Sequence, residues 1–128
     1  DPKKRLDTVP SHRPVKVVLG GEVVSQTTRA IFAFEGNHPL RFYIPKSDVR
    51  MDLLTPTATT SVCPYKGRAG YFAAMINGTV YNDIAWCYFE TLPECPRIKD
   101  LICFFNENVD ALFLDGKELA RPETKWRK

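Results

Sequence analysis

Short apolar stretches alternate with turn residues over most of the chain, a pattern typical of β-strands. Val15, Val17 and Leu19 form one alternating row, and Gly20-Gly21 then supplies a tight turn into a second apolar run. Two such runs around a two-residue glycine turn predict a β-hairpin. The same reasoning predicts further strands at residues 29–34, 41–44, 57–63 and 111–114.

The clearest hairpin is expected around Asn77-Gly78, which lies between the apolar runs 70–76 and 80–89. Within the second run, Ile84, Trp86 and Tyr88 alternate and should share one face of a strand. By the same alternation the intervening residues point to the opposite face: Tyr81, Asp83, Ala85, Cys87 and Phe89.

One segment has a helical pattern. Thr91-x-x-Glu94 is a capping box with Pro93 in the first turn, a favourable helix start. Apolar residues then recur every three or four positions, at Cys95, Ile98, Leu101, Ile102, Phe105 and Val109. We therefore predict a mainly β protein of antiparallel sheets with one C-terminal amphipathic helix around residues 92–108.

A length of 128 residues suits one domain, and 44% hydrophobic with 26% charged residues is ordinary globular composition. Three prolines among polar residues predict a flexible arm over residues 1–14. The domain itself is expected over 15–119, followed by a basic tail at 120–128. No apolar run approaches the about 18 residues that a membrane span needs, so we expect no membrane association.

The net charge of +3 comes from the two ends of the chain. Residues 1–16 and 117–128 each carry five basic and two acidic groups, so the remaining eight basic and eleven acidic residues make 17–116 net −3. A nucleic-acid binder should instead carry a basic stripe on its folded face. We expect no nucleic-acid partner, and a monomer or homodimer.

The four cysteines, Cys63, Cys87, Cys95 and Cys103, form no C-x-x-C pair, and the two histidines lie far away in sequence. This spacing does not resemble a zinc site, and it is sparse for a disulfide framework. Reduced thiols in a cytoplasmic protein are the better interpretation. We accordingly expect no metal and no other cofactor.

The densest chemistry lies in Cys63-Pro64-Tyr65-Lys66-Gly67-Arg68. A thiol near an ammonium and a guanidinium is a setting that produces a reactive thiolate. Gly67 would allow a positive φ or a close approach of the backbone to a ligand. In the alternative, Cys63 is a buried packing residue and Lys66 is solvated.

A second cluster combines Asp83 with Trp86 and Tyr88. The two aromatic residues could form one wall of a pocket, with Asp83 as a general base or as the partner that orients Lys66. In the alternative, the aromatic residues belong to the core and Asp83 is a surface residue.

Several motifs resemble a known family in order and spacing from about Val15 to Leu119. They are Phe42-Tyr43-Ile44-Pro45, Asp48-Val49, Met51-x-Leu53-Leu54, Cys63-Pro64-Tyr65-Lys66-Gly67-x-Ala69-x-Tyr71, Ala85-Trp86-x-Tyr88 and Pro93-Glu94. Through these motifs the chain resembles domain-of-unknown-function family 427. The resemblance implies a fold similar to the β-tent of the cereblon ligand-binding domain and of B-type methionine sulfoxide reductases.

The resemblance also bears on chemistry. Zinc-bearing β-tents use two C-x-x-C knuckles that this chain lacks, so zinc is not implied. The family carries the label nucleotidyltransferase, but the sequence does not support it. A Gly-Ser followed by paired metal-binding carboxylates, the motif of that activity, is absent from the chain. What the resemblance does imply is one cavity lined by a set of signature residues: Cys63, Tyr65, Lys66, Gly67, Asp83, Trp86 and Tyr88.

Three functions follow as hypotheses. The first is an enzyme acting on a small planar, anionic or carbonyl-bearing metabolite, with Cys63, Lys66 and Asp83 as catalytic residues. Its ligand would be bound by Tyr65, Gly67, Arg68, Trp86 and Tyr88. The second is a non-catalytic module that binds a small ligand between Trp86 and Tyr88, and the third is a structural protein.

Overall fold

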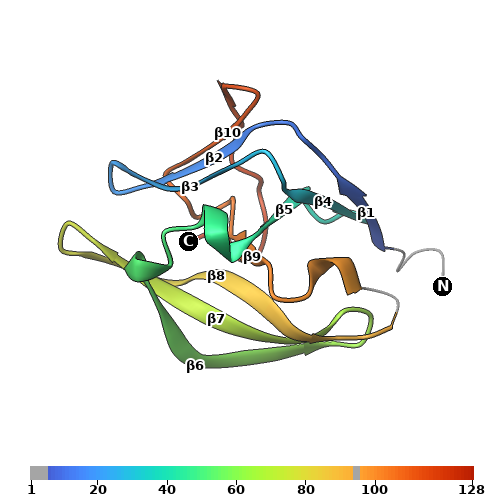
Figure 1. Cartoon of the computed structure of the whole chain (residues 1–128). Coiled ribbons are helices and arrows are strands. Elements are labelled where there is room, and N and C mark those ends of the chain that lie inside the picture. The colour runs from blue at the N-terminus through green and yellow to red at the C-terminus, as the bar shows by residue number, and fades with distance from the viewer. Residues whose placement is uncertain (1–5, 94–95) are drawn as a thin grey trace.

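The computed structural model describes residues 6–93 and 96–128, whose strands form two antiparallel sheets (Figure 1). The larger sheet contains, in spatial order, β1 (Leu6–Pro10), β4 (Ile31–Glu35), β5 (Arg41–Ile44), β9 (Ile102–Phe104), β8 (Thr79–Thr91), β7 (Gly67–Ile76) and β6 (Leu54–Cys63). The smaller sheet contains β11 (Lys117–Glu118), β10 (Ala111–Leu114), β2 (Val15–Leu19) and β3 (Glu22–Thr27). Within residues 6–93 and 96–128, strands are also connected by single-turn 3₁₀ helices: η2 (Lys46–Asp48), η3 (Met51–Leu53) and η4 (Pro96–Ile98). The predicted mainly β, antiparallel fold is confirmed.

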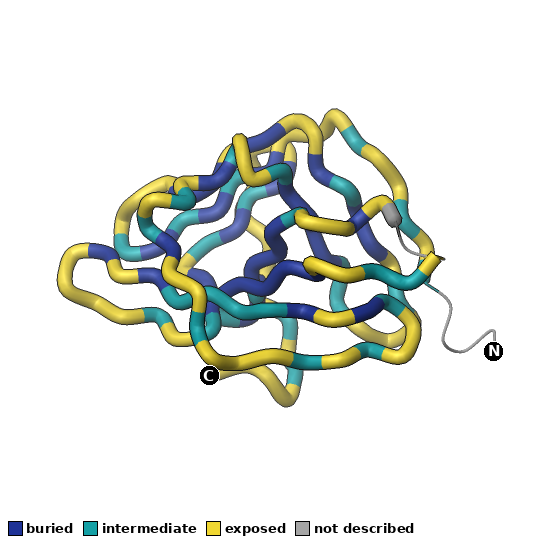
Figure 2. The backbone as a smooth tube through the Cα atoms, turned by 60° about the horizontal axis from the view of Figure 1, so that its bottom comes forward, coloured by how far each residue is buried: buried dark blue, intermediate teal, exposed yellow. Residues whose placement is uncertain are grey.

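The main core lies between the two sheets, where inward-facing rows of both meet (Figure 2). Val15, Val17 and Leu19 of β2 are fully buried, as their alternation predicted. They share one apolar cluster with Phe32 of β4 and Phe42 of β5 from the larger sheet. Burial of this row contributes about 1.5–3 kcal/mol per large side chain.

The β7–β8 hairpin forms as predicted, with Asn77 and Gly78 both at positive φ in its turn. Positive φ at both turn positions matches the right-handed twist of the flanking strands. Further along β8 the register shifts opposite Phe72 and Ala74, and Asp83 takes a φ of 46° there. This bulge interrupts the alternation, so Ile84 packs in the main core, whereas Trp86 and Tyr88 pack in a second cluster on the outer side of the larger sheet.

The predicted helix around residues 92–108 is wrong. Thr91 is the last residue of β8, and Ile102–Phe104 form β9. Glu94 of the predicted capping box and Cys95 of the predicted apolar stripe lie outside the described residues. β9 pairs with β5 on one side and β8 on the other, so all three of its residues are buried. A strand buried on both faces has a continuous apolar run, which periodicity alone does not distinguish from a helix segment. In the described part of the chain, no helix is long and apolar enough to cross a membrane.

Strand structure begins before Val15. Leu6–Pro10 form β1 along β4, within the segment for which the prolines predicted a flexible arm. Pro10 is accommodated because β1 is an edge strand of the larger sheet, and prolines are tolerated on edge strands. Pairing of β1 with β4 helps to place the end of β4 at the candidate site.

Candidate functional site

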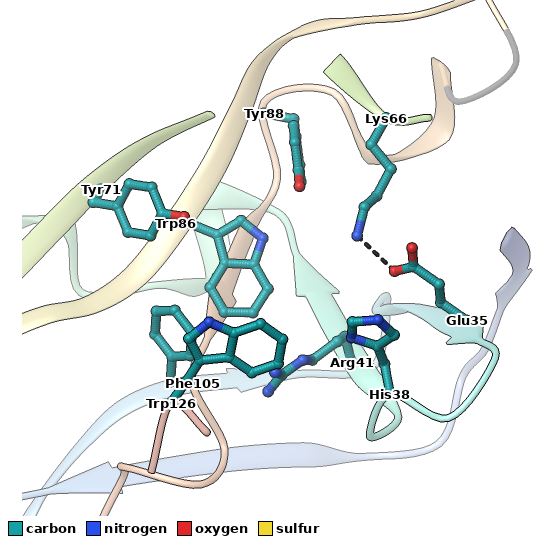
Figure 3. Close-up of a pocket in the computed structure, with 9 residues that line it drawn as sticks. All are labelled: Glu35, His38, Arg41, Lys66, Tyr71, Trp86, Tyr88, Phe105 and Trp126. Carbon is teal, nitrogen blue, oxygen red and sulfur yellow. Dashed lines mark hydrogen bonds and ion pairs between the residues drawn. The ribbon is translucent and has the colours of Figure 1, made fainter. Parts of the chain in front are cut away.

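A cavity of about 140 Å³ opens on the outer side of the larger sheet (Figure 3). Its lining comes from strands of the larger sheet, from the turns and loops between them, and from the C-terminal segment. The residues are Glu35 at the end of β4, His38 in the following turn, Arg41 of β5, Lys66 before β7, Tyr71 of β7, Trp86 and Tyr88 of β8, Phe105 after β9, and Trp126. Aromatic rings therefore face a group of charged side chains across the cavity.

The aromatic side is built on Phe105. Its ring centroid lies 4.4 Å from that of Trp86 and 6.3 Å from that of Tyr71, whose ring plane is 19° from parallel to it. The Trp86 indole N–H donates to the hydroxyl of Tyr43, 3.3 Å away, which fixes the orientation of the ring. Trp86 thus offers a ligand the face of its ring, because its single donor is already used.

The charged side contains an ion pair between Lys66 and Glu35. Lys66 Nζ lies 2.7 Å from Glu35 Oε1, and the two side chains are only 13% and 18% exposed. Lys66 belongs to the tight turn between β6 and β7, where its backbone N–H donates to the carbonyl of Cys63 and its own carbonyl accepts from Leu92. The ammonium also lies 5.6 Å from the ring centroid of Tyr88. These contacts fix Lys66 at the rim of the cavity.

Gly67 makes this turn possible. Its φ is +135°, a conformation that side-chain-bearing residues rarely adopt, and a Cβ added there would lie 2.0 Å from the carbonyl oxygen of Glu90. The positive φ expected from the sequence is present. The close approach is to the backbone of β8, so Gly67 acts on the site by seating the Lys66 turn against that strand.

Arg41 forms the floor of the cavity. Its guanidinium donates to both oxygens of Glu107, at 2.5 and 3.0 Å, and to the side-chain oxygen of Asn106 at 2.6 Å. Its central carbon lies 5.1 Å from the ring centroid of Trp86 and 5.7 Å from that of Phe105. Burial by itself would raise the pKa of Glu107, but the hydrogen bond from Arg41 and further hydrogen bonds outweigh it and lower that pKa. Glu107 therefore stays ionised and neutralises Arg41.

Tyr88 supplies a proton donor. Figure 3 shows its hydroxyl pointing into the space between Trp86 and Lys66. Burial raises the pKa of Tyr88 well above its usual value, and the negative charges of nearby groups, including Glu35, raise it further. The hydroxyl keeps its proton at neutral pH and can donate it in a hydrogen bond to a ligand oxygen.

The predicted site residues separate into two groups. Lys66, Trp86 and Tyr88 line the cavity. Cys63 is half-buried against the cluster that contains Trp86 and Tyr88, and it is not among the lining residues. Tyr65, Gly67 and Arg68 also lie outside the lining, and Arg68 is exposed.

Asp83 lies at a neighbouring cavity of about 380 Å³. Its two carboxylate oxygens accept from the hydroxyls of Thr57 and Thr59, at 2.6 and 2.7 Å. The orientation of Lys66 that the sequence assigned to Asp83 is provided by Glu35.

Sequence reasoning missed six lining residues: Glu35, His38, Arg41, Tyr71, Phe105 and Trp126. One signal was present for Arg41, a charged residue that opens the apolar strand Phe42-Tyr43-Ile44 and so needs a buried partner. Tyr71 belongs to the motif that carried the family resemblance. Nothing in local sequence pointed to Trp126, which lies in the segment taken for a basic tail.

Comparison with known proteins identifies a family without a known activity. No curated protein matches the chain significantly. The family model described as "Domain of unknown function (DUF427)" matches residues 7–115, which include all of β2 to β10, β1 except for Leu6, and most of the cavity lining. The expected resemblance is confirmed, and the protein belongs to the family of the domain of unknown function DUF427.

Proposed function

We propose that this protein binds a small planar molecule bearing a carbonyl or carboxylate oxygen in the cavity between Trp86 and Lys66. The observation that carries the proposal is the position of Lys66. Its ammonium is paired with Glu35 at 2.7 Å, is only 13% exposed, and faces aromatic rings across a preformed cavity. Apolar walls with a few convergent polar groups are the usual composition of a small-molecule site.

The aromatic side chains that line the cavity favour a planar ligand. Trp86 and Phe105 bound one side of the cavity and Trp126 another, so that a flat ring makes more contact than a branched aliphatic group (Figure 3). The volume of about 140 Å³ suits a single ring with a small substituent.

The hydrogen-bond donors at the cavity favour a ligand with an oxygen acceptor. Tyr88 offers a hydroxyl proton, and Lys66 offers the N–H groups that its pair with Glu35 does not use. Arg41 contributes the flat face of its guanidinium, which donates hydrogen bonds to Asn106 and Glu107. A ligand carbonyl or carboxylate can therefore accept from Tyr88 and Lys66 while its ring lies on the aromatic side.

Intrinsic fluorescence tests this proposal directly, because Trp86 and Trp126 are the only two tryptophans of the chain and both line the cavity. Benzoate and benzamide serve as a charged and a neutral probe of the same shape. We expect saturable quenching with a Kd on the order of 1 mM for at least one of them. Lys66→Met should weaken that binding about tenfold.

The matched control is Arg68→Met, which removes a cation two residues away that is exposed and outside the lining. Binding to this variant should equal that of the wild type. Absence of saturable quenching by either probe, or equal losses in the Lys66 and Arg68 variants, would contradict the proposal.

Acid–base catalysis is a second candidate, favoured by the direct contact of an ammonium and a carboxylate at the cavity. In an enolisation, Glu35 would accept a proton from the carbon next to a carbonyl while Lys66 donates a proton, and Tyr88 a hydrogen bond, to the carbonyl oxygen. Return of a solvent deuteron to carbon then exchanges the hydrogen. Acetophenone in D₂O should lose its methyl proton NMR signal faster with the protein than without it.

Two variants separate the forms of this candidate. Glu35→Gln should abolish the exchange if Glu35 is the base. Cys63→Ala tests the separate hypothesis that Cys63 is a nucleophile. If it is, removal of the sulfur should abolish the catalysed reaction.

A further inference from the structure

Trp126 closes the cavity from outside the sheets. Its ring stacks on His38, with centroids 5.7 Å apart and planes 24° from parallel, and it lies 5.9 Å from the central carbon of Arg41. It remains 37% exposed, and it lies beyond the range matched by the family model, which ends at residue 115. One wall of the site thus comes from a segment outside the two sheets.

Side-chain hydrogen bonds hold this segment in place. Asn108 Nδ2 donates to the carbonyl of Trp126 at 2.9 Å and its Oδ1 accepts from the backbone N–H of Lys128 at 2.7 Å. Thr124 Oγ1 donates to Glu107 at 2.8 Å and accepts from the N–H of Trp126 at 3.1 Å. None of these bonds belongs to the strand pairing of either sheet, so their release would free Trp126 without unpairing a strand.

Trp126 also separates two cavities. It lines both the cavity of about 140 Å³ and the neighbouring one of about 380 Å³, together with Tyr71 and Phe105. Tyr71 is fixed within β7, and the backbone N–H of Phe105 donates to the carbonyl of Ile84 in β8. Of the three shared residues, Trp126 is the one that the larger sheet does not hold.

We propose that Trp126 is the specificity-determining partition of the site. With its ring on His38 it limits the ligand to one ring, and its displacement joins the two cavities into a site for a two-ring or elongated ligand. The inference rests on the proposed binding function, because it assigns to Trp126 the choice among ligands of the same cavity.

The test compares Kd values of benzoate and biphenyl-4-carboxylate, measured by calorimetry, for the wild type, Trp126→Phe and Trp126→Ala. We expect the wild type to favour benzoate. Trp126→Ala should shift the ratio of the two Kd values at least tenfold toward the longer probe, whereas Trp126→Phe, which keeps an aromatic wall, should shift it less. Acrylamide quenching of Trp86, which is 7% exposed, should increase in Trp126→Ala relative to Trp126→Phe.

The outcomes separate this inference from the binding proposal. If benzoate binds the wild type but the Kd ratio is the same in Trp126→Ala, the partition is refuted and the binding function stands. If benzoate binds none of the three proteins, the binding function fails and takes the partition with it. Thermal unfolding checks that the variants are folded; we expect little change, since Trp126 is partly exposed and outside the core clusters.

Discussion

Arg41 and Glu107 form a two-pronged ion pair beneath the cavity, with both carboxylate oxygens of Glu107 accepting from the guanidinium of Arg41. Glu107 is fully buried, and the Arg41 side chain is 10% exposed. The pair links the first strand residue of β5 to the loop after β9, which are 66 positions apart in the chain. Because Thr124 also binds Glu107, the same carboxylate supports the segment that carries Trp126.

Glu107→Gln should be strongly destabilising. It leaves the Arg41 charge buried without a counter-ion, and breaking one half of a buried pair costs about 3–5 kcal/mol. Urea unfolding followed by circular dichroism measures the change. Asp115→Asn, in the exposed pair of Arg13 and Asp115, is the control and should cost less than about 1 kcal/mol. Equal losses in the two variants would show that the buried pair has no special role.

The stability of the protein should fall in acid through Glu107. Its pKa is lowered in the folded state, so its contribution is complete above the pKa of an unfolded glutamate, about 4.3, and is lost as pH falls through the folded value. Urea midpoints measured from pH 7 down to pH 3 should decrease below about pH 4.5. In Glu107→Gln that decrease should be smaller, because the titrating group is gone; an unchanged slope would assign the acid sensitivity to other carboxylates.

Gly67→Ala should unfold the protein or cost more than about 4 kcal/mol, because the new methyl group overlaps the carbonyl of Glu90 in addition to straining φ. Gly78→Ala is the matched control. Gly78 also has a positive φ, +81°, but nothing lies within 4 Å of a Cβ there. It should therefore lose only the strain term of about 1–2 kcal/mol. Thermal melting of both variants tests the difference, and similar melting temperatures would contradict it.

Alkylation by iodoacetamide should modify Cys63 well before Cys87 or Cys103. Cys63 is half-buried, whereas the other two are buried. Burial raises the pKa of Cys103 to about 12 and also raises the pKa of Cys87, which keeps both thiols protonated and unreactive at neutral pH. Mass spectrometry of peptides from the native protein gives the order of modification. Early labelling of Cys103 would show that the β5–β9–β8 region opens easily.

Local patterns predicted the elements whose character depends on near neighbours. The Val15–Leu19 row and the Asn77-Gly78 hairpin formed as expected, because a two-residue turn and a period of two are properties of adjacent residues. The helix prediction for residues 92–108 was wrong for the opposite reason. Their apolar spacing reflects burial of β9 between β8 and β5, of which β5 is distant in the chain, and a helix template matches the same spacing.

The candidate site shows the same division. The chain's motifs brought out Lys66, in the turn before β7, and Trp86 and Tyr88, on β8. The family resemblance also implied that Cys63 and Asp83 line the same cavity. The bulge at Asp83 and the turn at Gly67 direct these two side chains elsewhere, and a bulge is decided by the pairing of strands.

The pattern of residues along the chain was therefore sufficient to predict an antiparallel β protein, its hairpins, its family and three side chains of the cavity. The pairing of Lys66 with Glu35, the contact of Arg41 with Glu107 and the place of Trp126 in the aromatic wall depend on how the strands are assembled. Such contacts join residues 31 to 85 positions apart, whose partners depend on strand order and register. Strand order is set by the burial of the whole sheet, and no local pattern contains that information.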